Sequence, residues 1–282
     1  MADLGMPRLS IIIVTYNSRG HIDECLRSLV ENRPAVDHEI VVVDNASTDG
    51  TAAAVRARWN GVRVVDAGAN LGFARANNLG IQQTFGELIL LLNPDTSIPA
   101  HAVDMLLGAL DARPDVAIAG PRLVNADGRA ELSFGHMMSP LAEVRQKVLV
   151  RGSGRGGPIA MNVESMTRRE RDVDWVSGAC LLVRRTDAES VGLMDERYFM
   201  YAEDVDFCAA VRARGRRVLF YPAAEIVHIR GQSRATASAA SEQAYRRSQM
   251  AFYEKHHPGW APWLRWYLKI KGRLPDNRSS HE

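Results

Sequence analysis

The chain has 282 residues, of which 46% are hydrophobic and 24% are charged, and its formal net charge is +2. This composition is that of a soluble globular protein with room for a sizeable α/β core, and the small net charge argues against a nucleic-acid partner. The three cysteines, Cys25, Cys180 and Cys208, lie far apart without metal-ligand spacing, so we interpret them as buried thiols in a reducing compartment.

The first half of the chain alternates the patterns of buried strands and amphipathic helices. The stretch LSIIIVTY is almost wholly apolar and rich in β-branched residues, as in a parallel strand buried on both faces. Strands are predicted at 9–16, 39–47, 62–67, 87–95 and 115–121, and helices at 21–32, 47–59 and after Asn70. This alternation predicts an α/β fold with a Rossmann-like, mostly parallel sheet flanked by helices.

The pattern is less regular after residue 121. The stretch RGSGRGGP at 151–158 has the composition of a mobile surface loop, and it lacks the flanking strand and helix of a nucleotide-binding loop. Further elements are predicted as a strand at 173–185, a helix from the acids near 203 to Gly215, a strand at 217–222, and C-terminal helices at 238–256 and 261–272. The pattern shows no obvious second domain, and the last helices form a helical extension at 236–282.

Polar clusters follow the strands of the predicted sheet at 15–17, 44–45 and 93–95. Ligands of open α/β sheets bind beyond the carboxyl ends of the strands, so we expect a site there. Asp95, in the turn NPDT, could hold a divalent cation or cap the next helix. Asp44 could accept a hydrogen bond from a pyrimidine ring or belong to a turn.

Three other stretches carry candidate functional residues. The stretch NLGFARANNLG at 70–80 has glycines, asparagines and an arginine that could approach phosphates, or it is a loop that leads into a helix. His228 could be a metal ligand or a core residue. The acids Glu203, Asp204 and Asp206 could cap a helix, yet the apolar run before them would raise a carboxylate pKa toward that of a useful base.

As an ordered set, these stretches resemble family 2 glycosyltransferases with the GT-A fold, most closely their rhamnosyltransferase branch. The matching stretches are IIIVTYNS, VVVDNASTDGT, NLGFARANNLGI, LLLNPDT, VSGACLLVRR, DERYFMYAEDVDFC and VHIRGQS, which span roughly residues 9–235. The resemblance implies a GT-A domain at 1–235, with Asn93 standing where the family's D-x-D metal motif has its first acid.

The resemblance also implies the role of each site residue. Asp204 would be the catalytic base, and Asp95 with His228 would hold Mg²⁺ or Mn²⁺. Four further residues would contact the acceptor or tune Asp204: Glu203, Asp206, Trp175 and Gly178. The nucleotide-sugar donor would be bound by Thr15, Tyr16, Asn17, Asp44, Asn70, Gly72, Arg75, Asn77 and Asn93.

The implied reaction is transfer of a sugar, by preference L-rhamnose from dTDP-L-rhamnose, with inversion of the anomeric carbon. The acceptor would be a hydroxyl of a glycan or polyprenyl-linked saccharide in bacterial cell-surface polysaccharide synthesis. A sugar nucleotidyltransferase is one alternative, although the first strand lacks the glycine-rich basic loop expected of it. A non-catalytic nucleotide-sugar-binding module is another, and it would not need Asp204. A dinucleotide oxidoreductase is disfavoured, because no G-x-G-x-x-G follows the first strand.

The C-terminal segment WAPWLRWYLKIKGR at 260–273 combines aromatic and basic residues without an acid. It either lies at a membrane interface or packs its tryptophans on the core. No stretch is long and apolar enough to span a bilayer, and the apolar run near Ile11 lacks the basic flank of a signal peptide. We therefore expect a cytoplasmic protein, with peripheral contact at the inner face of the cell membrane under the first interpretation.

Overall fold

The computed structural model describes residues 5–153, 157–229 and 239–275. Its centre is one mixed sheet with the strand order β3-β2-β1-β4-β11-β6-β12-β5, with β7 paired to β6 and β9 paired to β12. The strands of this sheet are β1 (Leu9–Thr15), β2 (His38–Asp44), β3 (Val62–Asp66), β4 (Leu88–Leu92), β5 (Thr96–Ser97), β6 (Val116–Val124), β7 (Ala130–Glu131), β9 (Arg171–Asp172), β11 (Cys180–Arg184) and β12 (Arg217–His228). A separate small ladder joins β8 (Phe134–Gly135) to β10 (Trp175–Val176).

The half of the sheet from β3 to β4 is parallel, whereas β11 runs antiparallel between β4 and β6. The register pairs Thr15 with Asp44 and Asp44 with Asp66, so the carboxyl ends of β1, β2 and β3 finish at one edge. Strand ends that are 22 to 29 residues apart in the chain thereby present polar residues together, as the strand patterns predict.

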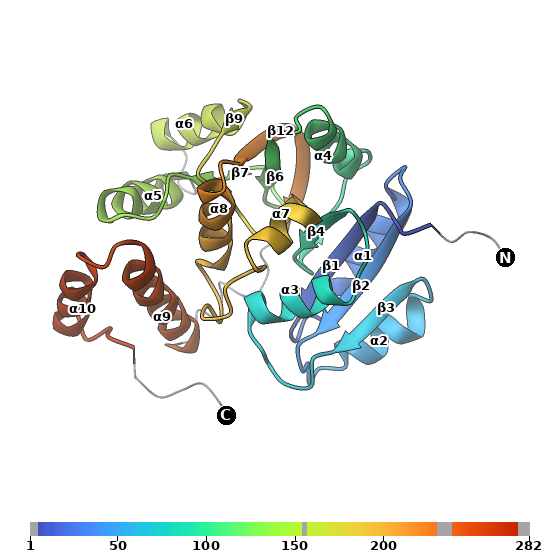
Figure 1. Cartoon of the computed structure of the whole chain (residues 1–282), viewed down its shortest axis with the longest axis horizontal. Helices are drawn as coiled ribbons and strands as arrows, with labels where there is room; N and C mark the ends of the chain where they lie inside the picture. The colour runs from blue at the N-terminus through green and yellow to red at the C-terminus, as the bar shows by residue number, and fades with distance from the viewer. Residues whose placement is uncertain (1–4, 154–156, 230–238, 276–282) are drawn as a thin grey trace.

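Helices cover both faces of the sheet (Figure 1). They are α1 (Ile22–Glu31), α2 (Thr51–Arg58), α3 (Phe73–Gln82), α4 (Ala102–Asp111), α5 (Pro140–Ser153), α6 (Pro158–Met166), α7 (Arg185–Ser190), α8 (Glu203–Ala213), α9 (Ala239–His256) and α10 (Ala261–Ile270). Alternate residues of β1 enter two separate apolar clusters, one with α1 and α4 and the other with α3 and α8. This period-2 division is what a strand buried on both faces requires.

The C-terminal helices pack on the segment that precedes α8. Phe252 and Tyr253 of α9 form a third apolar cluster with Tyr198, Ala202 and Val205. In Figure 1, α9 and α10 lie at the end of the molecule opposite β3. Among the described residues, no helix is both long and apolar enough to cross a bilayer.

Two predictions about local structure were wrong. Residues 151–153 end helix α5 and Pro158 begins α6, so four of the five described residues of the predicted loop at 151–158 are helical, and residues 154–156 lie outside the described part. The predicted strand at 173–185 is two strands, β10 and β11, because residues 177–179 turn away from the ladder. The composition of the first stretch hid α5 and α6, since glycine disfavours a helix only by about 1 kcal/mol per residue.

Candidate active site

The carboxyl ends of β1 and β2 present buried polar atoms to which the described residues offer no partner. Asp44 is 5% exposed; its Oδ2 accepts a hydrogen bond from the Ser47 N–H at 3.0 Å. Asp44 Oδ1 and Thr15 Oγ1 have no hydrogen-bond partner among the described residues. A buried acceptor without a partner costs about 1–3 kcal/mol, so this pair of atoms indicates a place where a ligand completes the bonding.

Asn45, next to Asp44, holds the loop before α3. Its Nδ2 donates to Asn70 Oδ1 at 2.9 Å, and its Oδ1 accepts from the Leu71 N–H at 2.8 Å. Asn70 Oδ1 also accepts from the Gly72 N–H at 3.2 Å. The side chain of Asn70 is therefore used to shape the loop, and its predicted contact with the donor would be an additional one.

Gly72 lies where this loop contacts the acidic segment. It has a φ of +80°, and a Cβ there would lie 2.3 Å from the Phe199 carbonyl oxygen. The next residue, Phe73, donates its N–H to that oxygen at 2.6 Å. Only glycine fits both the left-handed backbone and the contact, and the contact brings the segment before Glu203 against the loop that begins α3.

Asp204 is bound to the turn between β10 and β11. Its Oδ2 accepts from the Gly178 N–H at 2.9 Å, and its Oδ1 accepts from the Val205 N–H at 2.8 Å. The carbonyl of Ala179, the residue after Gly178, accepts a hydrogen bond from the Asn93 N–H at 2.9 Å. The turn that binds Asp204 therefore also contacts the NPDT turn. Burial raises the pKa of Asp204 and these N–H donors oppose the rise. The residue as a whole is partly exposed.

Glu203 is buried beside Asp204, and its Oε2 has no hydrogen-bond partner among the described residues. Burial, together with the charge of Asp204, raises the pKa of Glu203 well above its usual value. The two residues before it, Tyr201 and Ala202, have φ values of 72° and 65°, which are strained for residues with a Cβ.

The raised pKa of Glu203 predicts a pH dependence of folding. The native state keeps a proton that the unfolded chain loses above about pH 4.3, so stability should fall as pH rises from there toward the native pKa. The slope from one group is at most about 1.4 kcal/mol per pH unit. Glu203→Gln should flatten this slope, which denaturant unfolding at a series of pH values measures. Equal slopes in both proteins would contradict the assignment.

Asp95 and His228 meet at the edge of the sheet. Strand β12 pairs with β5 so that His228 lies opposite Thr96, directly after Asp95. His228 Nε2 is 3.3 Å from Asp95 Oδ1, and the other ring nitrogen, Nδ1, is 3.1 Å from Glu131 Oε2. Burial lowers the pKa of His228, but the hydrogen bonds and charges of the two acids outweigh it and raise the pKa.

Glu131 was missed in the sequence because it stands in a polar stretch without a recognisable motif. A carboxylate that accepts the Nδ1 proton of a histidine leaves Nε2 as the lone-pair nitrogen. Metal-ligating histidines usually have such a partner. Among the described residues, no three His, Cys, Asp or Glu side chains cluster as a metal site. The pair Asp95 and His228 suits an ion that takes its remaining ligands from phosphate and water.

The family model described as glycosyl transferase family 2 matches residues 10–174. The chain belongs to glycosyl transferase family 2. The protein named N-acetylglucosaminyl-diphospho-decaprenol L-rhamnosyltransferase from Mycobacterium tuberculosis is 34% identical over 93% of this chain and 89% of its own length. The resemblance inferred from the motifs is thereby confirmed.

Solved structures of glycosyltransferases share the fold. The mannosyltransferase PcManGT from Pyrobaculum calidifontis, in complex with GDP-Man and Mn²⁺, has a TM-score of 0.61 and 22% identity, over 93% of this chain and 69% of that one. TarS from S. aureus, in complex with UDP-GlcNAc, has a TM-score of 0.62 and 20% identity, over 87% of this chain and 65% of that one. The predicted GT-A fold class is confirmed.

In this family 2 glycosyltransferase, Asp206 points away from Asp204. It is 1% exposed, and its carboxylate accepts from Tyr198 Oη at 3.1 Å, Lys255 Nζ at 2.9 Å and His256 Nε2 at 2.6 Å. Its oxygens are engaged by Tyr198 and by two residues of α9, and contact of Asp206 with the acceptor, or tuning of Asp204 by it, stays a prediction. We assign Asp206 to the attachment of the C-terminal helices.

Several other predicted residues have partners within the protein. Asn77 is buried and donates to the Phe73 carbonyl, Arg75 lies 3.4 Å from Glu196, and Trp175 donates to the His136 carbonyl. Asn17 Oδ1 accepts from the Thr48 N–H at 2.8 Å, which ties the loop after β1 to the loop after β2. Tyr16 is half exposed. Donor contact by Tyr16, Asn17, Arg75 and Asn77, and acceptor contact by Trp175, stay predictions.

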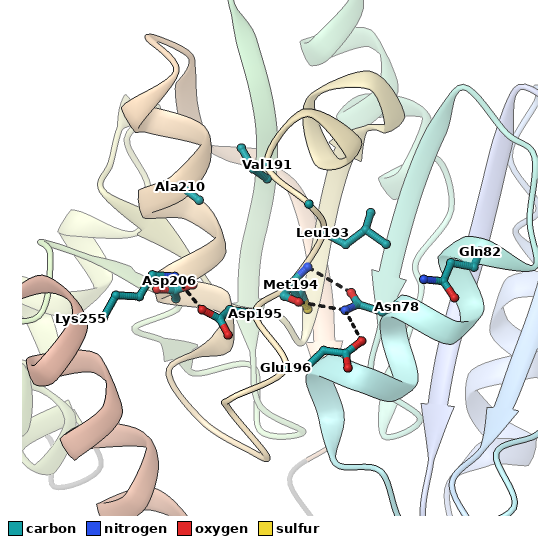
Figure 2. A pocket seen from close by; sticks show the side chains of 11 residues that line it. Asn78, Gln82, Val191, Leu193, Met194, Asp195, Glu196, Asp206, Ala210 and Lys255 are labelled. Carbon is teal, nitrogen blue, oxygen red and sulfur yellow. Dashed lines mark hydrogen bonds and ion pairs between the residues drawn. The ribbon is translucent and has the colours of Figure 1, made fainter.

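A hollow of about 360 Å³ lies beside α8 and is lined by Asp195, Glu196 and Asp206, among other residues. Figure 2 shows these side chains. Asn78 binds the backbone of Met194 at the edge of the hollow, since its Nδ2 donates to the Met194 carbonyl and its Oδ1 accepts from the Met194 N–H. Lys255 bridges Asp195 and Asp206. None of Asp44, Asp95 and Asp204 lines this hollow, so we interpret it as part of the packing between α3, α8 and α9.

Proposed function

We propose that this protein is an inverting glycosyltransferase that moves L-rhamnose from dTDP-L-rhamnose to a hydroxyl of a lipid-linked saccharide. The observation that carries the proposal is the contact of Phe199 with Gly72 and Phe73, which brings the acidic start of α8 to the loop of the predicted donor site. The named activity of the mycobacterial relative supports rhamnose and a polyprenyl diphosphate acceptor. Such an acceptor implies work at the inner face of the cell membrane, in cell-surface polysaccharide synthesis.

The donor's base would bind at the ends of β1 and β2. Asp44 Oδ1 and Thr15 Oγ1 are buried and without partners among the described residues, and a pyrimidine ring offers an imide N–H and a carbonyl to them. Thymine and uracil share these groups. The unpartnered atoms therefore support a pyrimidine nucleotide without separating dTDP from UDP.

A divalent cation, Mg²⁺ or Mn²⁺, would be held by Asp95 and His228, with Glu131 orienting the imidazole. When bound, such an ion neutralises the charge that develops on a leaving nucleoside diphosphate. The Mn²⁺ in the mannosyltransferase neighbour supports the presence of an ion in this fold.

Asp204 would accept the proton of the attacking acceptor hydroxyl. Its two oxygens are oriented by the Gly178 and Val205 N–H groups, so the carboxylate is preorganised, and its raised pKa makes it a better base than an exposed aspartate. The hydroxyl oxygen then forms the new bond to the anomeric carbon as the bond to the diphosphate breaks on the opposite face. Burial raises the pKa of Glu203 and so favours its neutral form, which would limit the negative charge beside Asp204.

A thermal-shift screen of nucleoside diphosphates and nucleotide sugars, with and without Mn²⁺, tests the donor proposal. A ligand that binds only the native state adds about 2.7 kcal/mol at about 100 times its Kd. We expect dTDP and UDP compounds with Mn²⁺ to raise the Tm and purine nucleotides to have little effect. Release of dTDP with a saccharide acceptor would then establish transfer. Formation of a free sugar phosphate would instead indicate a nucleotidyltransferase.

A further inference from the structure

Helix α10 exposes an apolar stripe to solvent. Trp263, Trp266, Tyr267 and Ile270 recur at the i, i+3, i+4, i+7 spacing of one helix face, and they are between 50% and 65% exposed. The opposite face is the buried one, through Ala261 and Leu268. The interpretation that the tryptophans pack on the core is therefore wrong.

The same segment carries a concentrated positive charge. Residues 260–275 contain Arg265, Lys269, Lys271 and Arg273 and no acidic residue. Arg265 pairs with Glu254 of α9, and Arg273 lies 3.6 Å from Glu242. Lys269 and Lys271 are exposed, with no ion pair in the part of the chain that the structure describes. Two exposed cations thus lie beside the aromatic stripe.

Helix α9 connects α10 to the active site. Ser248 Oγ donates to the Met200 carbonyl at 2.7 Å, just before Glu203, and the Lys255 and His256 contacts with Asp206 hold the other end of α9. Glu143 of α5 also holds α9, because its carboxylate accepts hydrogen bonds from Gln249 and Tyr253. The stripe is therefore anchored, through one helix, to the segment that presents Asp204.

We propose that residues 260–273, which we call the α10 surface, dock on an anionic lipid bilayer and hold Asp204 at a set height above it. Tryptophan and tyrosine beside lysine and arginine are the residues that occupy the interface between lipid headgroups and acyl chains. Basic residues near an anionic leaflet add about 1 kcal/mol each. Docking at this height would bring Asp204 to an acceptor whose polyprenyl tail stays in the bilayer, and that part of the proposal rests on the proposed function. The docking itself does not depend on it.

Vesicle co-sedimentation of the full chain, without substrates, tests the docking. We expect binding to phosphatidylcholine vesicles that contain phosphatidylglycerol, and weaker binding at high salt. Combining Trp263→Ser, Trp266→Ser and Ile270→Ser should abolish it, and Lys269→Gln with Lys271→Gln should weaken it about fivefold per charge. Phe85→Ser is the matched control, since Phe85 is 63% exposed but lies in the turn between α3 and β4.

The possible results distinguish a failure of the α10 surface proposal from a failure of the proposed glycosyltransferase function. Unchanged vesicle binding by the triple variant, at an unchanged Tm, would overturn the α10 surface. Loss of self-association by that variant, with no vesicle binding by the parent, would overturn it in favour of a contact between copies. The triple variant should still transfer sugar to a water-soluble acceptor. A parent that binds vesicles but transfers no sugar would overturn the proposed function alone.

Discussion

Asp204→Asn is expected to lower sugar transfer about a thousandfold while leaving the Tm and the donor affinity nearly unchanged. Asparagine has the shape of aspartate, and its amide oxygen still accepts from the Gly178 N–H, but it cannot take the proton of the acceptor hydroxyl. The measurements are kcat for dTDP release and the Tm shift by a nucleoside diphosphate with Mn²⁺. Normal transfer by this variant would remove Asp204 from the role of base.

The matched control for this prediction is Asp206→Asn, the same chemical change two residues later in α8. Asp206 is bound to Lys255, His256 and Tyr198, so its variant should lose stability, by about 1–3 kcal/mol, without a comparable loss of kcat below its Tm. A kcat loss equal to that of Asp204→Asn would show that both acids act together. Wild-type kcat should also fall with decreasing pH, since a base with a raised pKa becomes protonated at a higher pH than an ordinary aspartate.

Asp95→Ala is expected to remove the dependence of donor binding on a divalent cation and to lower transfer about a hundredfold or more. The change deletes one of two side chains that would hold the ion and removes the carboxylate oxygen that lies 3.3 Å from His228 Nε2. The decisive measurement is independent of turnover: titration of the protein and a nucleoside diphosphate with Mn²⁺, followed by Tm or by the electron paramagnetic resonance signal of free Mn²⁺.

Two further variants test whether the effect on Mn²⁺ binding is specific to Asp95. Glu131→Gln leaves both proposed ligands in place and should weaken Mn²⁺ affinity about tenfold, because the imidazole loses its charged acceptor. Asp66→Ala removes an exposed carboxylate at the same sheet edge, where it pairs with Arg56, and should leave Mn²⁺ binding unchanged. If Asp95→Ala and Asp66→Ala gave equal Mn²⁺ titrations, the cation site would have to lie elsewhere.

The local features of this chain were predictable from its sequence. Apolar runs rich in β-branched residues predict β1 and β2, a wholly apolar run predicts β4, and helical periodicity predicts α1, because these patterns depend only on neighbouring residues. The site edge was also predictable, since parallel strands end together and the residues after them are polar. The family followed from motifs in a fixed order, which the match over residues 10–174 confirms.

Contacts between distant segments were decided by the tertiary structure. Asp204 and Asp206 are two residues apart on one helix, so they point in different directions, and only the packing of α8 determines that one faces Gly178 and the other faces α9. The approach of Phe199 to Gly72 and of Glu131 to His228 joins residues about 100 or more apart. The exposure of Trp263 and Trp266 likewise depends on which face of α10 meets α9. The physical reason is that residue spacing sets which side chains share a face, whereas the partner of that face is chosen by the packing of the whole chain.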